Sequence, residues 1–305
     1  MKYKDFNTRE HGFVGHMVEP DKETKQAVIV VMGGEKSLVP GMKIAERFAD
    51  YGILGLSVSL FGAEGLPEGV DCIPVDMFEP AIKYLREERH MKSISIYGMS
   101  MGSIFAALAA KYIQGIDNVI LVSPSHVPFE GTMKDKRHMT GHSMAVWHGM
   151  EIPYVKQDFS VIKAGKYFFD AEAGRKVMGM WLAYRDAYSD KELEQMANIH
   201  IEETKSRILM LAGTGDEAWP SDYSVMYLKK YLDEIGYDKE YKAVLYPDAS
   251  HLIGMMPNKE RNKWLYRMMP LIGFMYKSFG KHREECLKAL EESEKEIIGW
   301  IKQEK

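Results

Sequence analysis

Three side chains that together could activate a nucleophile each follow a predicted strand. Ser100 is the centre of the G-x-S-x-G sequence at 98–102, and Asp216 and His251 follow two later apolar runs. A serine hydroxyl is a poor nucleophile until an imidazole accepts its proton, and a carboxylate on the second ring nitrogen fixes the imidazole tautomer. We therefore predict Ser100 as nucleophile, His251 as general base and Asp216 as the acid that orients the base.

Each of these residues also has an ordinary structural interpretation. A G-x-S-x-G sequence alone fits a tight turn, Asp216 fits a loop carboxylate or helix cap, and the chain has 10 histidines. Glu217 is a rival for the acid. We favour Asp216 because a shorter side chain leaving a strand end is better fixed in place.

The neighbours of Ser100 favour the nucleophile. Ser93–Tyr97 is a short β-branched run, typical of a buried strand, and Ile104–Ala110 is rich in Ala and Leu, typical of a helix. So tight a turn needs small residues on both sides and lifts the central side chain clear of the sheet. Because the first helical N–H groups then face the attacked carbonyl, we expect Met101 N–H to bind the oxyanion.

A second oxyanion donor is expected in the loop after the apolar run Ala27–Met32. Gly33, Gly34 and Glu35 follow this run, and glycines there let backbone N–H groups approach a ligand closely. In serine hydrolases of this layout the corresponding loop supplies the second N–H. The sequence leaves Gly34 and Glu35 both open.

The order of elements predicts an α/β fold with a mostly parallel, doubly wound sheet and helices on both faces. It is also the layout in which a serine, an acid and a histidine follow one another at strand ends, that of the α/β-hydrolases. We expect strands at 12–19, 27–32, 53–60, 93–97, 118–123, 207–212 and 240–246. We expect helices at 40–51, from Pro74 to about Arg89, at 104–110, at 221–235 and through 257–305.

The stretch from Pro124 to about His200 breaks this alternation. It is rich in Gly, Trp and His and contains no clear strand, so we predict a cap inserted over the carboxyl ends of the strands. Residues 1–305 would then form a single domain. Met99, Trp147 and Trp219 are expected to contact the substrate.

Composition excludes several classes of partner. The net charge of −4 gives no reason to expect a nucleic acid or an anionic membrane surface, and no apolar run approaches membrane-spanning length. Cys72 and Cys286 have no metal-binding spacing and fit reduced thiols of a cytoplasmic protein. The polar first residues contain no signal-peptide core. We expect no metal and no organic cofactor, and the oligomeric state stays open.

Several stretches resemble one family more specifically than the serine motif does. They lie at 77–112, at 116–131 (IDNVILVSPSHVPFEG), at 143–154 (SMAVWHGMEIPY), at 208–221 (ILMLAGTGDEAWPS) and at 246–251, which contains PDASH. On these residues the chain resembles the C-terminal catalytic domain shared by acyl-CoA thioesterases and bile acid-CoA:amino acid N-acyltransferases, especially its bacterial forms. The resemblance matches Ser100 to the nucleophile, Asp216 to the acid and His251 to the base. Full-length eukaryotic relatives carry an N-terminal β-sandwich domain, which we expect this chain to lack.

The resemblance implies hydrolysis of acyl thioesters, such as acyl-CoA, or of carboxylic esters through an acyl-Ser100 intermediate. The amino-acid-transferring members have cysteine where this chain has Ser100, which favours hydrolysis. The alternatives are another hydrolase of this fold (an esterase, a dienelactone-type hydrolase or a peptidase), acyl transfer to an amine, and a binding protein on a degenerate hydrolase scaffold.

Overall fold

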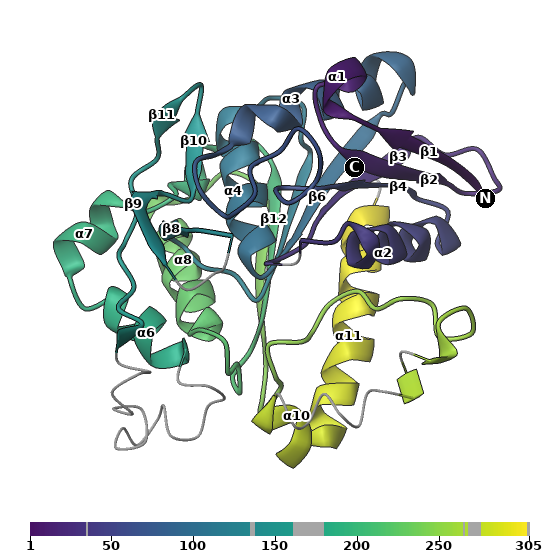
Figure 1. The fold of residues 1–305 in the computed structure, drawn as a ribbon. Helices are drawn as coiled ribbons and strands as arrows, with labels where there is room; N and C mark the ends of the chain where they lie inside the picture. The colour runs from purple at the N-terminus through teal and green to yellow at the C-terminus, as the bar shows by residue number, and fades with distance from the viewer. Residues whose placement is uncertain (35, 135–137, 161–179, 265, 268–275, 304–305) are drawn as a thin grey trace.

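An eight-stranded sheet runs through the molecule, with the strand order β1-β2-β4-β3-β6-β7-β12-β13 (Figure 1). The structure is a computed structural model that describes all residues except 35, 135–137, 161–179, 265, 268–275 and 304–305. The first two strands pair antiparallel, and the other six run parallel to one another. The strands are β1 (Lys2–Phe6), β2 (Gly15–Glu19), β3 (Gln26–Val31), β4 (Leu54–Val58), β6 (Ser93–Met99), β7 (Asn118–Val122), β12 (Arg207–Gly213) and β13 (Tyr241–Tyr246).

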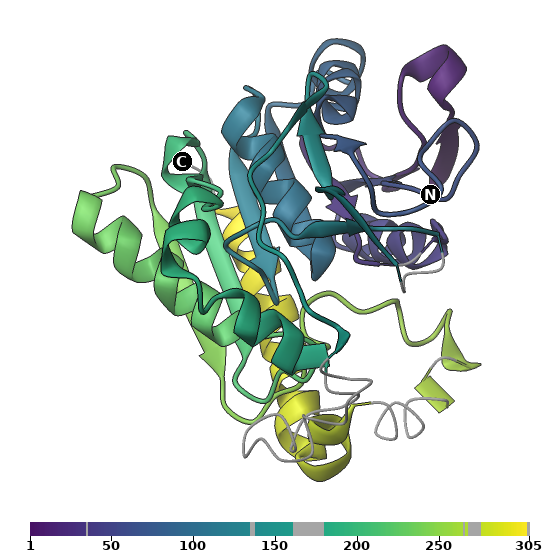
Figure 2. The same cartoon turned by 60° about the vertical axis from the view of Figure 1, so that its left-hand side comes forward.

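Two layers of helices cover the sheet, because the central strands are apolar on both faces. Ile29 and Val31 of β3 belong to a core shared with α3, α4 and α8, whereas Val28 and Val30 belong to a core shared with α2 and α11 (Figure 2). The predicted mostly parallel, doubly wound sheet is therefore confirmed. The helices are α1 (Thr8–His11), α2 (Val39–Asp50), α3 (Phe78–Lys83), α4 (Met101–Tyr112), α6 (Met180–Ala187), α7 (Lys191–Met196), α8 (Ser221–Ile235), α10 (Lys277–Lys281) and α11 (Arg283–Lys302).

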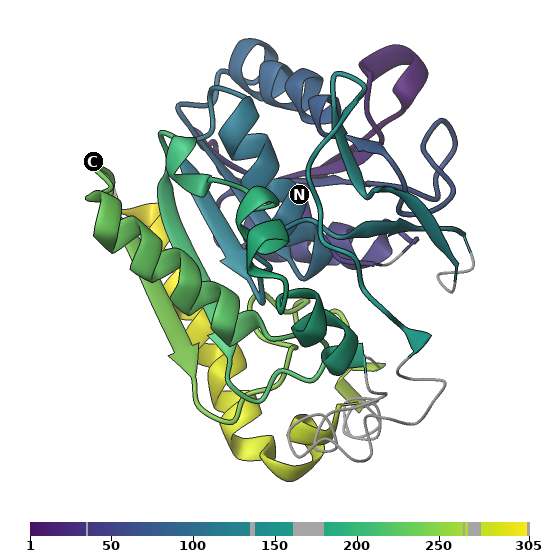
Figure 3. The ribbon, with the colours of Figure 1, turned by 90° about the vertical axis from the view of Figure 1, so that its left-hand side faces the viewer.

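The stretch 124–200 differs from its prediction because it contains strands. They are β8 (Glu130–Thr132), β9 (Met139–Ser143), β10 (Ala145–Trp147) and β11 (Met150–Glu151), and they lie outside the main sheet (Figure 3). β8, β10 and β11 have only two or three residues each, and β9 (MTGHS) has no apolar run, so none of them gives a strand pattern in the sequence. Phe129, Val155 and Tyr188 are buried in the same core as α4, so the flanks of this stretch are part of the domain's interior. Residues 161–179 lie outside the described residues.

Two other element predictions need correction, and one strand was missed. The helix expected from Pro74 to about Arg89 is not continuous. Ile73 and Pro74 form the short strand β5, which pairs with β10. A 3₁₀ turn (Val75–Met77), the helix α3 and a π-helical turn (Tyr84–Glu88) follow it. The strand β1 was not predicted because this edge strand exposes nearly all its side chains and has no apolar run. Residues 257–262 do not form a helix: they are irregular and then a turn.

The helix α4 starts against the end of β3. A methyl group on Gly102 would collide with the carbonyl oxygens of Val31 and Met32, and one on Gly98 would lie 2.6 Å from Ser103 Cα. Backbone atoms cannot move aside cheaply, so both positions require glycine. This contact fixes where the first turn of α4 stands relative to the sheet.

We expect Gly102→Ala to lower the free energy of unfolding by at least about 2 kcal/mol, because the added methyl group overpacks a backbone contact. The matched control is Gly299→Ala, since Gly299 lies within α11 with no atom within 4 Å of an added methyl group. That control should raise stability by about 0.5–1 kcal/mol through helix propensity. Urea denaturation measures both variants, and equal stabilities would contradict the packing argument.

Candidate active site

Ser100 occupies the turn between β6 and α4 in a strained conformation. Its φ is 57° and its ψ is −129°, a region that non-glycine residues rarely adopt. Its N–H donates to Val122 O at 2.9 Å, and its carbonyl accepts from Ser103 N (2.9 Å) and Ser103 Oγ (2.6 Å). The side chain is half-buried. The backbone is thus held on both sides of a residue that the tight turn places at the carboxyl end of the sheet.

His251 and Asp216 meet at the carboxyl ends of β13 and β12. His251 Nδ1 lies 2.8 Å from Asp216 Oδ2, and the two side chains are almost fully buried. Because a carboxylate only accepts, the neutral ring carries its proton on Nδ1, which makes Nε2 the basic nitrogen. This is the contact expected between a base and its orienting acid.

The Asp216 carboxylate is itself held by three further donors. Ser221 Oγ donates to Oδ2 at 2.5 Å, and the N–H groups of Ala218 and Trp219 donate to Oδ1 at 2.8 and 3.3 Å. Ser221 was not singled out from the sequence, although it closes the DEAWPS stretch. The Ser221 hydroxyl and the His251 ring both contact Asp216 Oδ2, so the hydrogen bond from Ser221 helps to hold this oxygen in position.

Ser123 joins the turn of Ser100 to the loop of His251. It follows Val122, which binds the Ser100 amide, and its Oγ donates to His251 O at 2.8 Å. Its own carbonyl accepts from Trp219 Nε1 at 3.0 Å. The loops that carry Ser100 and His251 are therefore both anchored to the end of β7.

The predicted oxyanion donors come from two segments, the start of α4 and the loop after β3. Met101 is the first residue of α4, where a backbone N–H has no acceptor within the helix. Gly34 is half-buried in the loop after β3, and the contact of Gly102 with Met32 O brings this loop close to the start of α4. Glu35 lies outside the described residues.

The three predicted substrate contacts lie in different places. The Trp219 ring packs edge-on against the His251 ring at 5.6 Å. Met99 is half-buried and precedes Ser100, packing against the core on the α2 face. Trp147 stacks on Tyr112 at 4.9 Å, at the end of α4 remote from Ser100, so the structure does not bring Trp147 to the other two.

A second buried acid–histidine pair lies in the Ser-His-Val stretch. His126 Nε2 lies 3.0 Å from Glu194 Oε1, and its Nδ1 lies 3.0 Å from Ser224 Oγ. Burial lowers the pKa of His126, so the ring is neutral near pH 7. Burial opposes ionisation of Glu194, but hydrogen bonds from His126, Lys191 and Tyr223 outweigh it and lower the pKa of this carboxyl to about 2. This pair joins the loop after β7 to α7 and α8, and no sequence pattern marks it.

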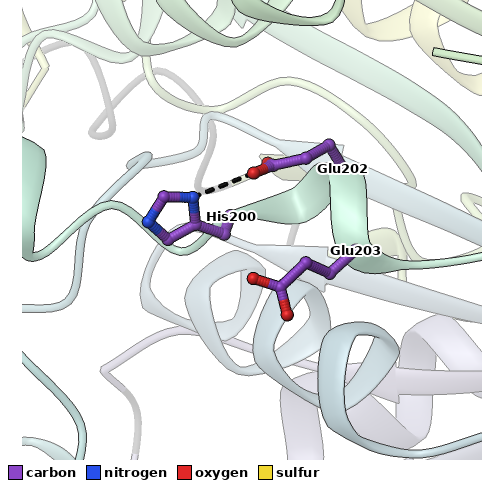
Figure 4. Close-up of side chains that lie close together, drawn as sticks. All are labelled: His200, Glu202 and Glu203. Carbon is purple, nitrogen blue, oxygen red and sulfur yellow. Dashed lines mark hydrogen bonds and ion pairs between the residues drawn. The ribbon is translucent and has the colours of Figure 1, made fainter. Parts of the chain in front are cut away.

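Among the described residues, one group of side chains combines residue types that could ligate a metal ion. Figure 4 shows His200, Glu202 and Glu203 around the 3₁₀ turn Ile201–Glu203. Glu202 Oε1 already accepts from Tyr231 Oη (3.1 Å) and lies 2.9 Å from His200 Nδ1, and Glu203 pairs with Lys111 at 3.3 Å. The turn precedes β12, whereas Asp216 follows that strand, so the group lies away from Ser100. We assign it no role in the site.

A family model described as BAAT / Acyl-CoA thioester hydrolase C terminal matches residues 73–259, more than half of the chain. The chain belongs to this family. The match confirms the resemblance stated from the sequence, and the matched range contains Ser100, Asp216 and His251.

Individual relatives of this BAAT / Acyl-CoA thioester hydrolase C terminal member are distant. Human "Acyl-coenzyme A thioesterase 6" is 22% identical over 77% of this chain and 50% of its own length. Mouse "Peroxisomal succinyl-coenzyme A thioesterase" is 26% identical over 67% of this chain and 44% of its own length. The chain thus spans about half the length of these relatives. A solved "Lipase (Open form)" has a TM-score of 0.50 at 16% identity, covering 81% of this chain and 90% of its own, and it agrees with an α/β-hydrolase fold.

The described part of the chain contains no helix long and apolar enough to cross a membrane.

We expect His126 to make the protein less stable as the pH falls. The pKa of His126 is lower in the folded than in the unfolded state, so its contribution is fully present above about pH 6.5 and is lost as the pH falls below that value, by at most about 1.4 kcal/mol per pH unit. His126→Gln should reduce this loss between pH 6.5 and 5, measured by denaturation at each pH. His142→Gln is the control, because His142 is exposed and its pKa is raised by Glu151. An unchanged pH dependence in His126→Gln would contradict burial of a neutral ring.

Proposed function

We propose that this chain is a serine hydrolase that cleaves acyl thioesters, acyl-CoA among them, or carboxylic esters through an acyl-Ser100 intermediate. The observation that carries the proposal is the 2.8 Å contact between His251 and Asp216, beside a strained turn that presents Ser100. Membership of the BAAT / Acyl-CoA thioester hydrolase C terminal family and relatives named as acyl-CoA thioesterases support the substrate class.

In the first half of the reaction, Ser100 Oγ attacks the carbonyl carbon while His251 Nε2 accepts the hydroxyl proton. The imidazolium is stabilised by Asp216, which stays ionised. The negative charge on the carbonyl oxygen is bound by Met101 N–H and a second N–H from Gly34 or Glu35. Collapse of the intermediate breaks the C–S or C–O bond, and the leaving thiolate or alkoxide takes the proton from His251.

In the second half, water attacks the acyl-Ser100 ester and gives its proton to His251 Nε2. Collapse of this intermediate releases the carboxylic acid and returns the proton to Ser100 Oγ. The cycle consumes one water and needs no external oxidant, metal or organic cofactor. A thioester suits such a site because a thiolate is a good leaving group.

The acyl group is proposed to lie against Trp219, with Met99 on the other side of the nucleophile. Trp219 contacts His251 and packs against the rings of Phe129 and Tyr184 at 5.7 and 5.3 Å. These rings form an apolar wall next to the base. We propose that residues 1–305 form one domain and that the cap 124–200 closes over the acyl group, because an insertion at this point of the chain sits above the carboxyl ends of the strands. A cytoplasmic location is proposed from the two unpaired cysteines.

The test is hydrolysis of acyl-CoA and p-nitrophenyl esters of increasing chain length by the wild type and Ser100→Ala. We expect Ser100→Ala and Asp216→Asn each to lower kcat/KM by ~10³-fold or more while the protein stays folded. Mass spectrometry of the products with excess glycine present should find mainly the free acid. Mostly N-acylglycine would instead indicate a transferase, and full activity in Ser100→Ala would exclude the mechanism.

A further inference from the structure

Glu217 is a buried acid beside Asp216 whose two oxygens are both engaged. Its side chain is almost fully buried, and the residue is 1% exposed. Oε2 accepts from Ser250 Oγ at 2.9 Å and from His251 N–H at 3.2 Å. Oε1 accepts from Ser278 N–H at 2.7 Å. Burial of a carboxylate is costly without such donors, so the arrangement is a specific one.

We propose that Glu217 is a positioning residue for His251. The two consecutive acids bind different parts of the same histidine. Asp216 binds the imidazole ring, and Glu217 binds the backbone N–H. This inference rests on the proposed function, in which His251 is the base. Glu217 is not a second orienting acid, because its oxygens bind donors other than the ring nitrogen.

The third partner of Glu217 extends this support to the C-terminal part of the chain. Ser278 lies in the first turn of α10, and its Oγ also donates to Gly215 O at 2.6 Å. Gly215 N–H in turn donates to Ala249 O at 2.9 Å. The loops that carry the acid and the base are therefore joined to α10 through Glu217 and its neighbours.

Only a carboxylate of this length satisfies both backbone donors. Each oxygen of Glu217 faces a different N–H, one from His251 and one from Ser278. The amide of Gln has one oxygen, so its NH₂ group must face one of these N–H groups. Asp keeps the charge but is one methylene shorter and cannot span the two donors. Glu217→Gln therefore tests the loss of the charge, and Glu217→Asp tests the shortening of the side chain.

Other titratable groups lie around the base. Cys286 of α11 lies near the loop, and burial raises the pKa of its thiol to about 11, so it stays neutral in the assay range. Asp248 on the same loop is exposed. Asp216 and Glu217 bind His251, Asp248 lies on its loop, and the neighbouring helices α10 and α11 carry further ionisable groups, among them Lys277, Glu285 and Cys286.

The experiment compares Glu217→Gln with Glu194→Gln, a buried acid that also has three hydrogen-bond partners but does not contact His251. The readouts are kcat and KM for an acyl-CoA, thermal stability, and an NMR titration of the His251 ring assigned with His251→Gln.

We expect Glu217→Gln to lower kcat by about 30-fold or more with KM within about threefold. It should also lower the pKa of His251 by about 0.5 unit or more, because a nearby negative charge is lost. Glu194→Gln should lower stability and leave the His251 titration unchanged.

An unshifted His251 titration together with a wild-type kcat in Glu217→Gln would overturn the proposal, and so would equal effects in Glu194→Gln. If Glu217→Gln does not fold, Glu217→Asp decides: a fall in kcat at constant KM supports positioning, and wild-type kcat contradicts it. Full activity in Ser100→Ala would overturn the proposed function separately. The titration needs no turnover, so it still tests Glu217 in that case.

Discussion

The close contact between the first turn of α4 and the end of β3 is the constraint on which the site depends. Gly98 and Gly102 leave no room for a side chain, and Ser100 between them adopts φ 57°. Such a conformation costs on the order of 1–3 kcal/mol and persists only where the surrounding structure imposes it. The buried sheet and the two helical layers supply that support. This turn places the Ser100 hydroxyl and the N-terminus of α4 together at the carboxyl edge of the sheet.

His251 is held in a different way, by hydrogen bonds between neighbouring loops. His251 is bound at its ring by Asp216, at its N–H by Glu217 and at its carbonyl by Ser123. These partners come from two strand ends, β12 and β7. Because parallel strands bring their carboxyl ends to one edge, residues far apart in the chain meet there. The site is therefore a product of the sheet topology together with a few short polar side chains.

The sequence predicted the sheet and the order of its catalytic candidates because long apolar runs and glycine turns leave clear patterns. Asp216 contacts the His251 ring and Glu217 contacts its backbone N–H, which agrees with the preference based on side-chain length, and the catalytic role of Asp216 stays a prediction. The strands within 124–200, the edge strand β1 and the place of Trp147 were not predictable, since strands without a long apolar run and stacking partners depend on tertiary contacts. The contacts of Ser123, Ser221 and Glu217 were missed for the same reason: a buried serine or acid has no periodic signal.

The most direct test of the central claim, that Ser100 is the acylated nucleophile, is chemical quenching of a single turnover with an acyl-CoA, followed by peptide mapping. Cleavage after Lys92 and Lys111 gives the peptide 93–111, in which Ser93, Ser95, Ser100 and Ser103 are distinguished by fragmentation. The account predicts an acyl mass increment on Ser100 that forms and decays with product release. An increment on Cys72, Cys286 or another serine would contradict it, as would turnover with no adduct on this peptide.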